Sequence, residues 1–85
     1  MRFLIKSTFK APPTEEVLAL IPVEQAMLTE LAEQGIHEAS YVAADLSNAW
    51  AVWNCESQAA LEETHKTLPL HEYLNIDITL LSDEF

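Results

Sequence analysis

Apolar and polar residues alternate at the two ends of the chain. In residues 1–10, MRFLIKSTFK, the apolar Phe3, Ile5 and Phe9 alternate with largely polar residues, and residues 74–81 repeat this alternation. Side chains of a β-strand point alternately to its two faces, so a period of two is typical of a half-buried strand. Both segments are therefore predicted to be strands.

A helical period follows the first strand and extends to Gln34. Thr14 is a suitable N-cap for it, and Gly35 is a suitable C-terminal stop. Pro22 interrupts the pattern, and proline is tolerated only in the first turn of a helix. The sequence therefore predicts a short helical turn that ends at Leu20 and a main helix that begins at or near Pro22.

A second helix is predicted between the N-cap Ser57 and Pro69, which cannot continue it. Glu62 and Lys66 have the spacing and orientation of a favourable i,i+4 ion pair on this helix. The apolar stripe of the helix consists of Leu61, Thr64 or His65, and Leu68.

Two strand-length runs, HEASYVAAD and NAWAVWNCE, lie between the helices and are joined by Leu46, Ser47 and Asn48. They are predicted to form a hairpin. The element order is then βαββαβ, which is the order of the ferredoxin-like α+β fold. We expect residues 1–85 to form a single domain, with a four-stranded antiparallel sheet and two helices on one face of it.

The sheet face that the helices leave uncovered has a mixed composition. Its residues are Arg2, Leu4, Lys6 and Thr8 on the first strand and Asn75, Asp77 and Thr79 on the last. A face that is neither fully polar nor fully apolar suits the interior of a barrel built by two such sheets, where a small ligand binds. We therefore expect a homodimer or a larger homo-oligomer.

Composition and charge exclude several kinds of partner. The chain has 85 residues, is 49% hydrophobic and carries a formal net charge of -10 with only 4 Lys and Arg. Such a chain has no basic footprint for a nucleic acid or an anionic membrane surface. No apolar run approaches the ~20 residues of a membrane span. Cys55 is the only cysteine, no secretory leader is visible, and we expect a cytoplasmic protein.

Two stretches of the chain resemble a known family. LPLHEYLNIDITLL, residues 68–81, is similar to the C-terminal signature of the muconolactone isomerases, and MRFLIKSTFKAP resembles their first strand, with Lys6, Thr8 and Lys10 in place. The family pattern also extends from Gly35 to Leu81 without a gap. This resemblance implies a dimeric α/β barrel that moves a double bond in an unsaturated lactone without metal or cofactor.

Two residues are candidates for the chemistry that the resemblance implies. Glu24 lies on the apolar stripe of the first helix, where the family has a glutamate, and is the candidate proton carrier. The alternative is a glutamate at the edge of the stripe, stabilised by the helix dipole. Lys6 is the candidate for stabilising an enolate or binding a substrate carboxylate. Its alternative is an ion pair with Asp77.

The segment after Pro69 departs from the family, which has an aromatic residue and a proline where this chain has His71 and Glu72. His71 is the third candidate catalytic residue, as a proton shuttle at the mouth of the pocket, and its alternative is a surface-loop histidine. Candidate substrate-binding residues are Tyr41, Trp50, Trp53 and Tyr73. Aromatic residues also serve as core or interface packing, and strand parity places the two tryptophans on opposite faces.

His37 and His65 have no partners at metal-ligand spacing, so no metal site is predicted and both are assigned to packing. Three functions remain open for the chain. The first is a cofactor-independent isomerase of a small unsaturated lactone or cyclic ketone. The second is a cofactor-free monooxygenase of aromatic polyketides, which favours a tryptophan in the pocket. The third is a non-catalytic small-ligand-binding dimer, because one fold can host all three.

Overall fold

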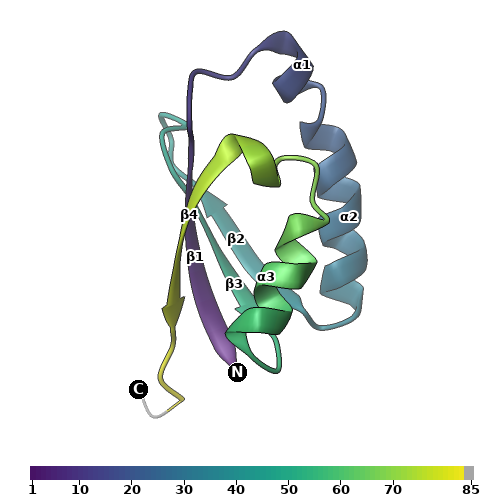
Figure 1. Cartoon of the computed structure of the whole chain (residues 1–85), viewed down its shortest axis with the longest axis vertical. Coiled ribbons are helices and arrows are strands. Elements are labelled where there is room, and N and C mark those ends of the chain that lie inside the picture. Colours follow the sequence, from purple (N-terminus) through teal and green to yellow (C-terminus); the bar gives the residue numbers. More distant parts are fainter. Residues whose placement is uncertain (84–85) are drawn as a thin grey trace.

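A four-stranded antiparallel sheet in the order β2-β3-β1-β4 is covered on one face by helices α2 and α3 (Figure 1). The computed structural model describes residues 1–83. The elements are β1 Arg2–Phe9, α1 Glu15–Leu18, α2 Ile21–Glu33, β2 His37–Val42, β3 Ala49–Asn54, α3 Gln58–Lys66, the single 3₁₀ turn η1 His71–Tyr73, and β4 Leu74–Leu80. The predicted ferredoxin-like α+β fold is confirmed.

The helix boundaries follow from the predicted capping residues. The Thr14 hydroxyl accepts a hydrogen bond from the Val17 N–H at 3.3 Å and begins the short α1. Pro22 lies in the first turn of the separate helix α2. Backbone N–H groups of a first turn have no acceptor within the helix, so a proline there costs no hydrogen bond. Gly35 has a φ of 78°, which most side chains avoid, and ends the helical segment. The predicted division of this region at Pro22 is confirmed.

Helix α3 also begins as predicted, since the Ser57 hydroxyl accepts a hydrogen bond from the Ala60 N–H at 3.1 Å. The predicted ion pair between Glu62 and Lys66 is wrong. Lys66 Nζ lies 3.7 Å from Glu63 instead. Glu62 accepts a 3.4 Å hydrogen bond from the Gln58 side chain one turn earlier, which directs its carboxylate away from Lys66.

Strands β2 and β3 are shorter than predicted, because the connection between them has its own hydrogen bonds. The Asp45 carboxylate accepts hydrogen bonds from the Ser47 N–H at 3.0 Å and the Ser47 hydroxyl at 2.6 Å. The Leu46 N–H bonds to the Ala43 carbonyl at 2.8 Å and closes a tight turn. Side-chain bonds of this kind compete with strand pairing. Residues 43–48 are therefore a loop and not strand ends.

The core lies between the sheet and its two covering helices. Phe3 pairs with Trp53 and Ile5 pairs with Ala51 across β1 and β3, so these side chains share the face that points to the helices. Phe3, Ile5 and Trp53 are buried against Leu61 of α3. Full burial of such side chains contributes roughly 1.5–3 kcal/mol each, and a shift of one residue in register would move them to the other face.

The opposite face carries a continuous row of side chains from edge to edge. Tyr41 pairs with Trp50, Trp50 with Lys6, and Lys6 with Asp77. Within the described residues no ion pair joins Lys6 to Asp77, although they are direct cross-strand partners. Tyr41 is 65% exposed on this face. We call this face, with Leu4, Lys6, Tyr41, Trp50, Val52 and Asp77, the outer sheet face.

His65 is a polar side chain that the fold buries. It lies on α3, is 4% exposed, and contacts the ring of Trp53 at a centroid distance of 5.8 Å. Burial, and secondarily the neighbouring His71, lowers the pKa of His65 from 6.5 to about 4. The folded protein therefore holds this imidazole neutral at neutral pH.

We expect the free energy of unfolding to fall as the pH is lowered from about 7 to about 4. The folded-state pKa of His65 is below its ordinary value, so over this range the unfolded chain binds a proton that the folded protein does not. The stabilising contribution is complete above pH 6.5 and is lost toward pH 4, which amounts to roughly 3 kcal/mol. Urea denaturation across this range measures it.

The control for this prediction is His65→Gln, which keeps a polar side chain but cannot take up a proton in this range. Its stability should decline less steeply with falling pH. An equal decline in the variant and the wild type would assign the acid sensitivity to other groups.

Candidate functional site

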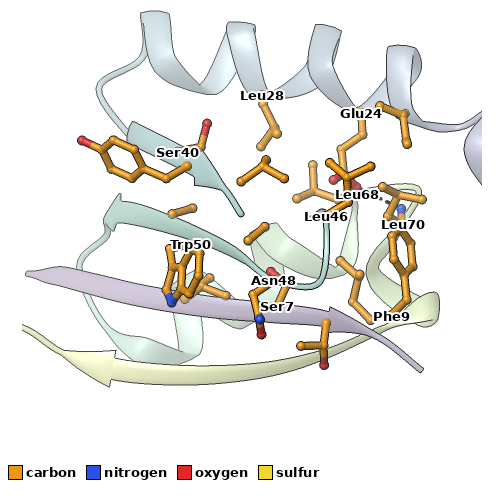
Figure 2. A pocket seen from close by; sticks show the side chains of 18 of the residues that line it. Ser7, Phe9, Glu24, Leu28, Ser40, Leu46, Asn48, Trp50, Leu68 and Leu70 are labelled. Carbon is orange, nitrogen blue, oxygen red and sulfur yellow. Dashed lines mark hydrogen bonds between the residues drawn. The ribbon is translucent and has the colours of Figure 1, made fainter. Parts of the chain in front are cut away.

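A cavity of about 550 Å³ lies between helix α2 and the sheet (Figure 2). Its walls are mainly apolar, with a few polar groups among them. The polar and charged side chains in its lining are Ser7, Thr8, Glu24, Gln25, His37, Ser40, Tyr41, Asp45, Ser47, Asn48 and His65. From the sequence, a ligand is expected on the mixed face of the sheet, in a barrel formed with a second copy, whereas this cavity lies on the helix-covered face of a single chain.

Glu24 points from α2 into the cavity, as Figure 2 shows. Its Oε1 accepts a hydrogen bond from the Leu70 N–H at 3.0 Å. Burial raises the pKa of the Glu24 carboxyl, and the hydrogen bond from Leu70 opposes this shift only in part. A carboxyl group with a raised pKa, held by one oxygen, can exchange a proton with a bound molecule through the other oxygen.

The segment from Leu68 to Tyr73 supplies the partner of Glu24. Pro69 ends the helical region, and the following residues turn back so that the Leu70 N–H faces α2. The turn is fixed by hydrogen bonds from the His71 N–H to the Leu68 carbonyl at 3.1 Å and from the Tyr73 N–H to the Leu70 carbonyl at 2.9 Å. This segment therefore closes one end of the cavity.

His65 and His71 form a close pair beside this closed end. Their Nδ1 atoms lie 2.6 Å apart, and their rings meet nearly edge to face at a centroid distance of 4.9 Å. At this separation one Nδ1 carries a proton and donates it while the other accepts. His65 lines the cavity, whereas His71 lines a second cavity at the surface together with Lys66, Leu68, Pro69 and Glu72.

His37 extends the row of rings on the other side of Trp53. The two ring centroids are 5.5 Å apart, and His37 also lines the cavity. Its buried Nε2 has no hydrogen-bond partner within the described residues. Burial lowers the pKa of His37, which favours the neutral ring. A neutral imidazole with an unused nitrogen can accept or donate one hydrogen bond to a ligand.

Leu46 borders the open side of the cavity, from the loop between β2 and β3 (Figure 2). Its backbone has a φ of 64°, a left-handed conformation that costs a leucine roughly 1–2 kcal/mol. The side chain is 74% exposed. The tight turn thus holds a large apolar side chain at the mouth, where it can contact an entering molecule.

The structure gathers only some of the predicted site residues at this cavity. Glu24 and Trp53 line it with their side chains, and Trp53 is at the same time 2% exposed core packing. Tyr41 and Trp50 contribute to the lining, but the strand register turns both side chains to the outer sheet face, and the Trp50 ring points away from α2 in Figure 2. The predicted placement of the two tryptophans on opposite faces is confirmed.

Three predicted residues lie elsewhere. Lys6 is exposed on the outer sheet face and does not line the cavity. Tyr73 does not line it either, and its side chain hydrogen-bonds Glu72, which raises the pKa of the phenol. His71 lies behind His65 and reaches the cavity only through that residue.

Sequence reasoning missed His65 and His37 at this site, because each looked like an isolated core histidine. The signal for His65 was present in its place on the apolar stripe of α3, which predicted that its ring would point inward. The signal for its pairing with His71 was absent, because it depends on the turn after Pro69.

The cavity contains no evident site for a metal ion. Within residues 1–83 no group of three or more His, Cys, Asp or Glu side chains could hold one. No Lys or Arg side chain from this part of the chain lines the cavity, whereas Glu24 and Asp45 do. Hydrogen bonds from Ser47 lower the pKa of Asp45, so this carboxylate stays charged at the mouth. Within residues 1–83 no helix is long and apolar enough to cross a membrane.

Solved structures with the same architecture include two that are named as enzymes. The crystal structure of a muconolactone isomerase superposes with a TM-score of 0.83 at 25% identity, covering 99% of this chain and 91% of that one. The 5-chloro-2-hydroxyhydroquinone dehydrochlorinase from Burkholderia phenoliruptrix, in complex with 2,5-dihydroxybenzoquinone, gives a TM-score of 0.78 at 13% identity, covering 96% and 94%. Rv0793 from Mycobacterium tuberculosis gives 0.58 at 18% identity, covering 99% and 98%. The last two likenesses concern the fold alone.

A search of curated protein sequences gave no significant match. The model of the muconolactone delta-isomerase family, in contrast, matches residues 1–84. Together with the fold and its cavity, this match shows that the chain belongs to the muconolactone delta-isomerase family.

Proposed function

We propose that this protein is a cofactor-independent isomerase that moves a carbon–carbon double bond in a small unsaturated lactone or cyclic ketone, with Glu24 as the proton carrier. The observation that carries the proposal is the Glu24 carboxyl, which lies in a mainly apolar cavity with a raised pKa and one oxygen fixed by the Leu70 N–H. Membership of the family supports the same reaction type.

The reaction needs one base that also acts as an acid. Glu24 as carboxylate removes a proton from the carbon at the far end of the conjugated system, and the C–H electron pair moves into a dienolate. The neutral Glu24 carboxyl then returns the proton to the carbon next to the carbonyl, and the double bond has moved. Burial raises the pKa of the Glu24 carboxyl, so its carboxylate is a stronger base toward the substrate C–H than that of an exposed glutamate.

The negative charge of the dienolate has to be stabilised by neutral donors. Lys6 was the predicted stabiliser, but its place on the outer sheet face does not support this role. Hydrogen-bond donors do line the cavity, among them Ser40 and Asn48. Donors that are fixed before the reaction stabilise a developing oxyanion without reorganisation.

The electrostatics of the cavity favour an uncharged substrate. Its carboxylates are Glu24 and Asp45, no Lys or Arg of the described residues lines it, and the chain has a formal net charge of -10. A substrate carboxylate brought into this space would lose its hydration without gaining a cation. We therefore propose a neutral lactone or ketone in place of an anionic one.

The other two candidate functions have less support. An oxygenase that used a tryptophan would need its ring free in the cavity, whereas the Trp53 ring packs between His37 and His65 and the Trp50 ring faces away. A non-catalytic ligand-binding dimer would use the same cavity, but it would not need a carboxyl with a raised pKa inside it.

We also propose that the outer sheet face pairs with a second copy of the chain. It exposes the aromatic Tyr41 and carries the apolar Leu4, Trp50 and Val52 beside Lys6 and Asp77. A sheet face of this composition is commonly covered in the folded assembly. The cavity lies on the other face, so pairing would leave it in each protomer.

Glu24→Gln should lower kcat by roughly 10²-fold or more, because glutamine cannot carry the proton. Turnover of muconolactone and of its methyl ester, followed by the change in conjugation, measures the effect. Glu30→Gln is the matched control, since Glu30 is an exposed glutamate of the same helix. Unchanged turnover in a folded Glu24→Gln protein would make Glu24 a structural residue.

The methyl ester of muconolactone should be the better substrate. We expect its kcat/KM to exceed that of anionic muconolactone by roughly 10-fold, which corresponds to about 1.4 kcal/mol of avoided carboxylate desolvation. Steady-state kinetics with both compounds test this. A higher kcat/KM for anionic muconolactone would contradict the proposal of a neutral substrate. It would require a cation near the cavity, and residues 1–83 of one chain place no Lys or Arg in its lining.

Sedimentation velocity at micromolar concentration should show a dimer or larger species. Val52→Glu places a carboxylate on the outer sheet face and should shift the protein toward the monomer. Val23→Glu is the matched control, because Val23 is exposed on α2 away from that face. A wild-type monomer, or dissociation by both variants alike, would argue against pairing through the sheet.

A further inference from the structure

The histidine pair connects two separate spaces. His65 lines the main cavity, and His71 lines the surface cavity of about 540 Å³ formed with Lys66, Leu68, Pro69 and Glu72. Their Nδ1 atoms, 2.6 Å apart, form the contact between the two spaces. Each imidazole has a second nitrogen, Nε2, on the opposite side of its ring. An imidazole can take up a proton at one nitrogen and release another proton from the other.

We infer that His65 and His71 form a proton relay between the main cavity and the solvent. The inference rests on the proposed function, because it assigns the relay to exchange the proton that the isomerisation removes. His65 is the inner member and faces the cavity, and His71 is the outer member. His71 acts through His65 and touches no substrate.

The relay can pass a proton in either direction, and each passage leaves the number of protons on the two rings unchanged. At the start each ring carries one proton. The His65 proton is on Nδ1 and is donated to His71 Nδ1, and the His71 proton is on Nε2. A proton that arrives at His65 Nε2 allows the Nδ1 proton to pass to His71, which releases its Nε2 proton to water. Both rings are then neutral with exchanged tautomers. Uptake of a proton from water at His71 Nε2 reverses each transfer and delivers a proton from His65 Nε2 to the cavity.

The surroundings keep His65, the inner member of the pair, neutral. Burial and the nearby His71 lower the pKa of His65, so a cationic His65 is only transient at neutral pH. The charged groups around the outer member are Lys66 and Glu72, one of each sign. On the cavity side Glu24 is held by the backbone of Leu70, the residue before His71. Glu24 and His65 therefore line the same cavity and are both positioned by one segment.

A consequence is that solvent hydrogen should enter the product. In D2O we expect wild-type enzyme to form product with solvent deuterium at the carbon that receives the proton, because the relay exchanges the abstracted proton before its return. His71→Asn can still hydrogen-bond His65 but cannot pass a proton on. Mass spectrometry of the methyl ester product should show at least a ~5-fold lower deuterium fraction in this variant, in keeping with the size of general acid–base effects. Equal deuterium fractions would overturn the relay.

A second measurement does not depend on turnover. In protein labelled with ¹⁵N-histidine, NMR reports the exchange of the His65 ring proton with water. We expect this exchange to be roughly 10-fold slower in His71→Asn than in the wild type. The matched control is Tyr73→Phe, a change in the same turn at a residue that lines neither cavity. Unchanged exchange in His71→Asn would overturn the relay even if the isomerase activity were present.

Chemical rescue separates loss of proton transfer from loss of structure. His71→Ala leaves space next to the surface cavity, and added imidazole should restore exchange of the His65 proton to near the wild-type rate. Absence of rescue in a folded variant counts against the relay. The wild type could show no turnover while its His65 ring proton exchanges fast and His71→Asn slows that exchange. This result would reject the proposed function and retain the relay.

Discussion

The hydrogen bond from the Leu70 N–H to the Glu24 carboxylate determines the geometry of the whole site. It joins residues 46 positions apart at 3.0 Å, and so ties α2 to the turn that precedes β4. On one side it orients the Glu24 carboxyl toward the cavity. On the other side it fixes the turn whose next residue, His71, meets His65. If this bond were absent, the buried Leu70 N–H would lack a partner and the Glu24 carboxyl would lose the hydrogen bond that orients it.

One physical cause acts on both Glu24 and His65 in the cavity. Removal from water disfavours any charged form, so it raises the pKa of Glu24 and lowers the pKa of His65. Both groups are thereby biased toward their neutral forms. The protonated carboxyl of Glu24 can donate a proton and its carboxylate can take one back, while the neutral imidazole of His65 can accept one. No Lys or Arg among the described residues lines the cavity.

The fold was largely predictable from the sequence, and the site was only partly so. Alternation, capping by Thr14 and Ser57, and the break at Pro22 are local signals, and each predicted element formed. The cavity under α2 was not predicted, because it depends on how α2 packs over the sheet, and no local pattern reports that distance. Glu24 was singled out by its helical stripe and by the family resemblance. Strand parity placed Lys6 on the mixed face, where the structure has it, but this is not the face that holds the cavity under α2.

The pairing of His65 with His71 explains why a departure from the family pattern can be accommodated at this turn. An aromatic residue at position 71, as the resemblance implies for the family, would offer no acceptor or donor to the buried His65 Nδ1. An imidazole at that position satisfies it at 2.6 Å, and an unsatisfied polar atom at this depth would cost about 1–3 kcal/mol. The two histidines therefore depend on each other energetically. The same contact that removes this cost also joins the cavity to the surface through titratable rings, so the stability of the turn and its chemistry have a common origin.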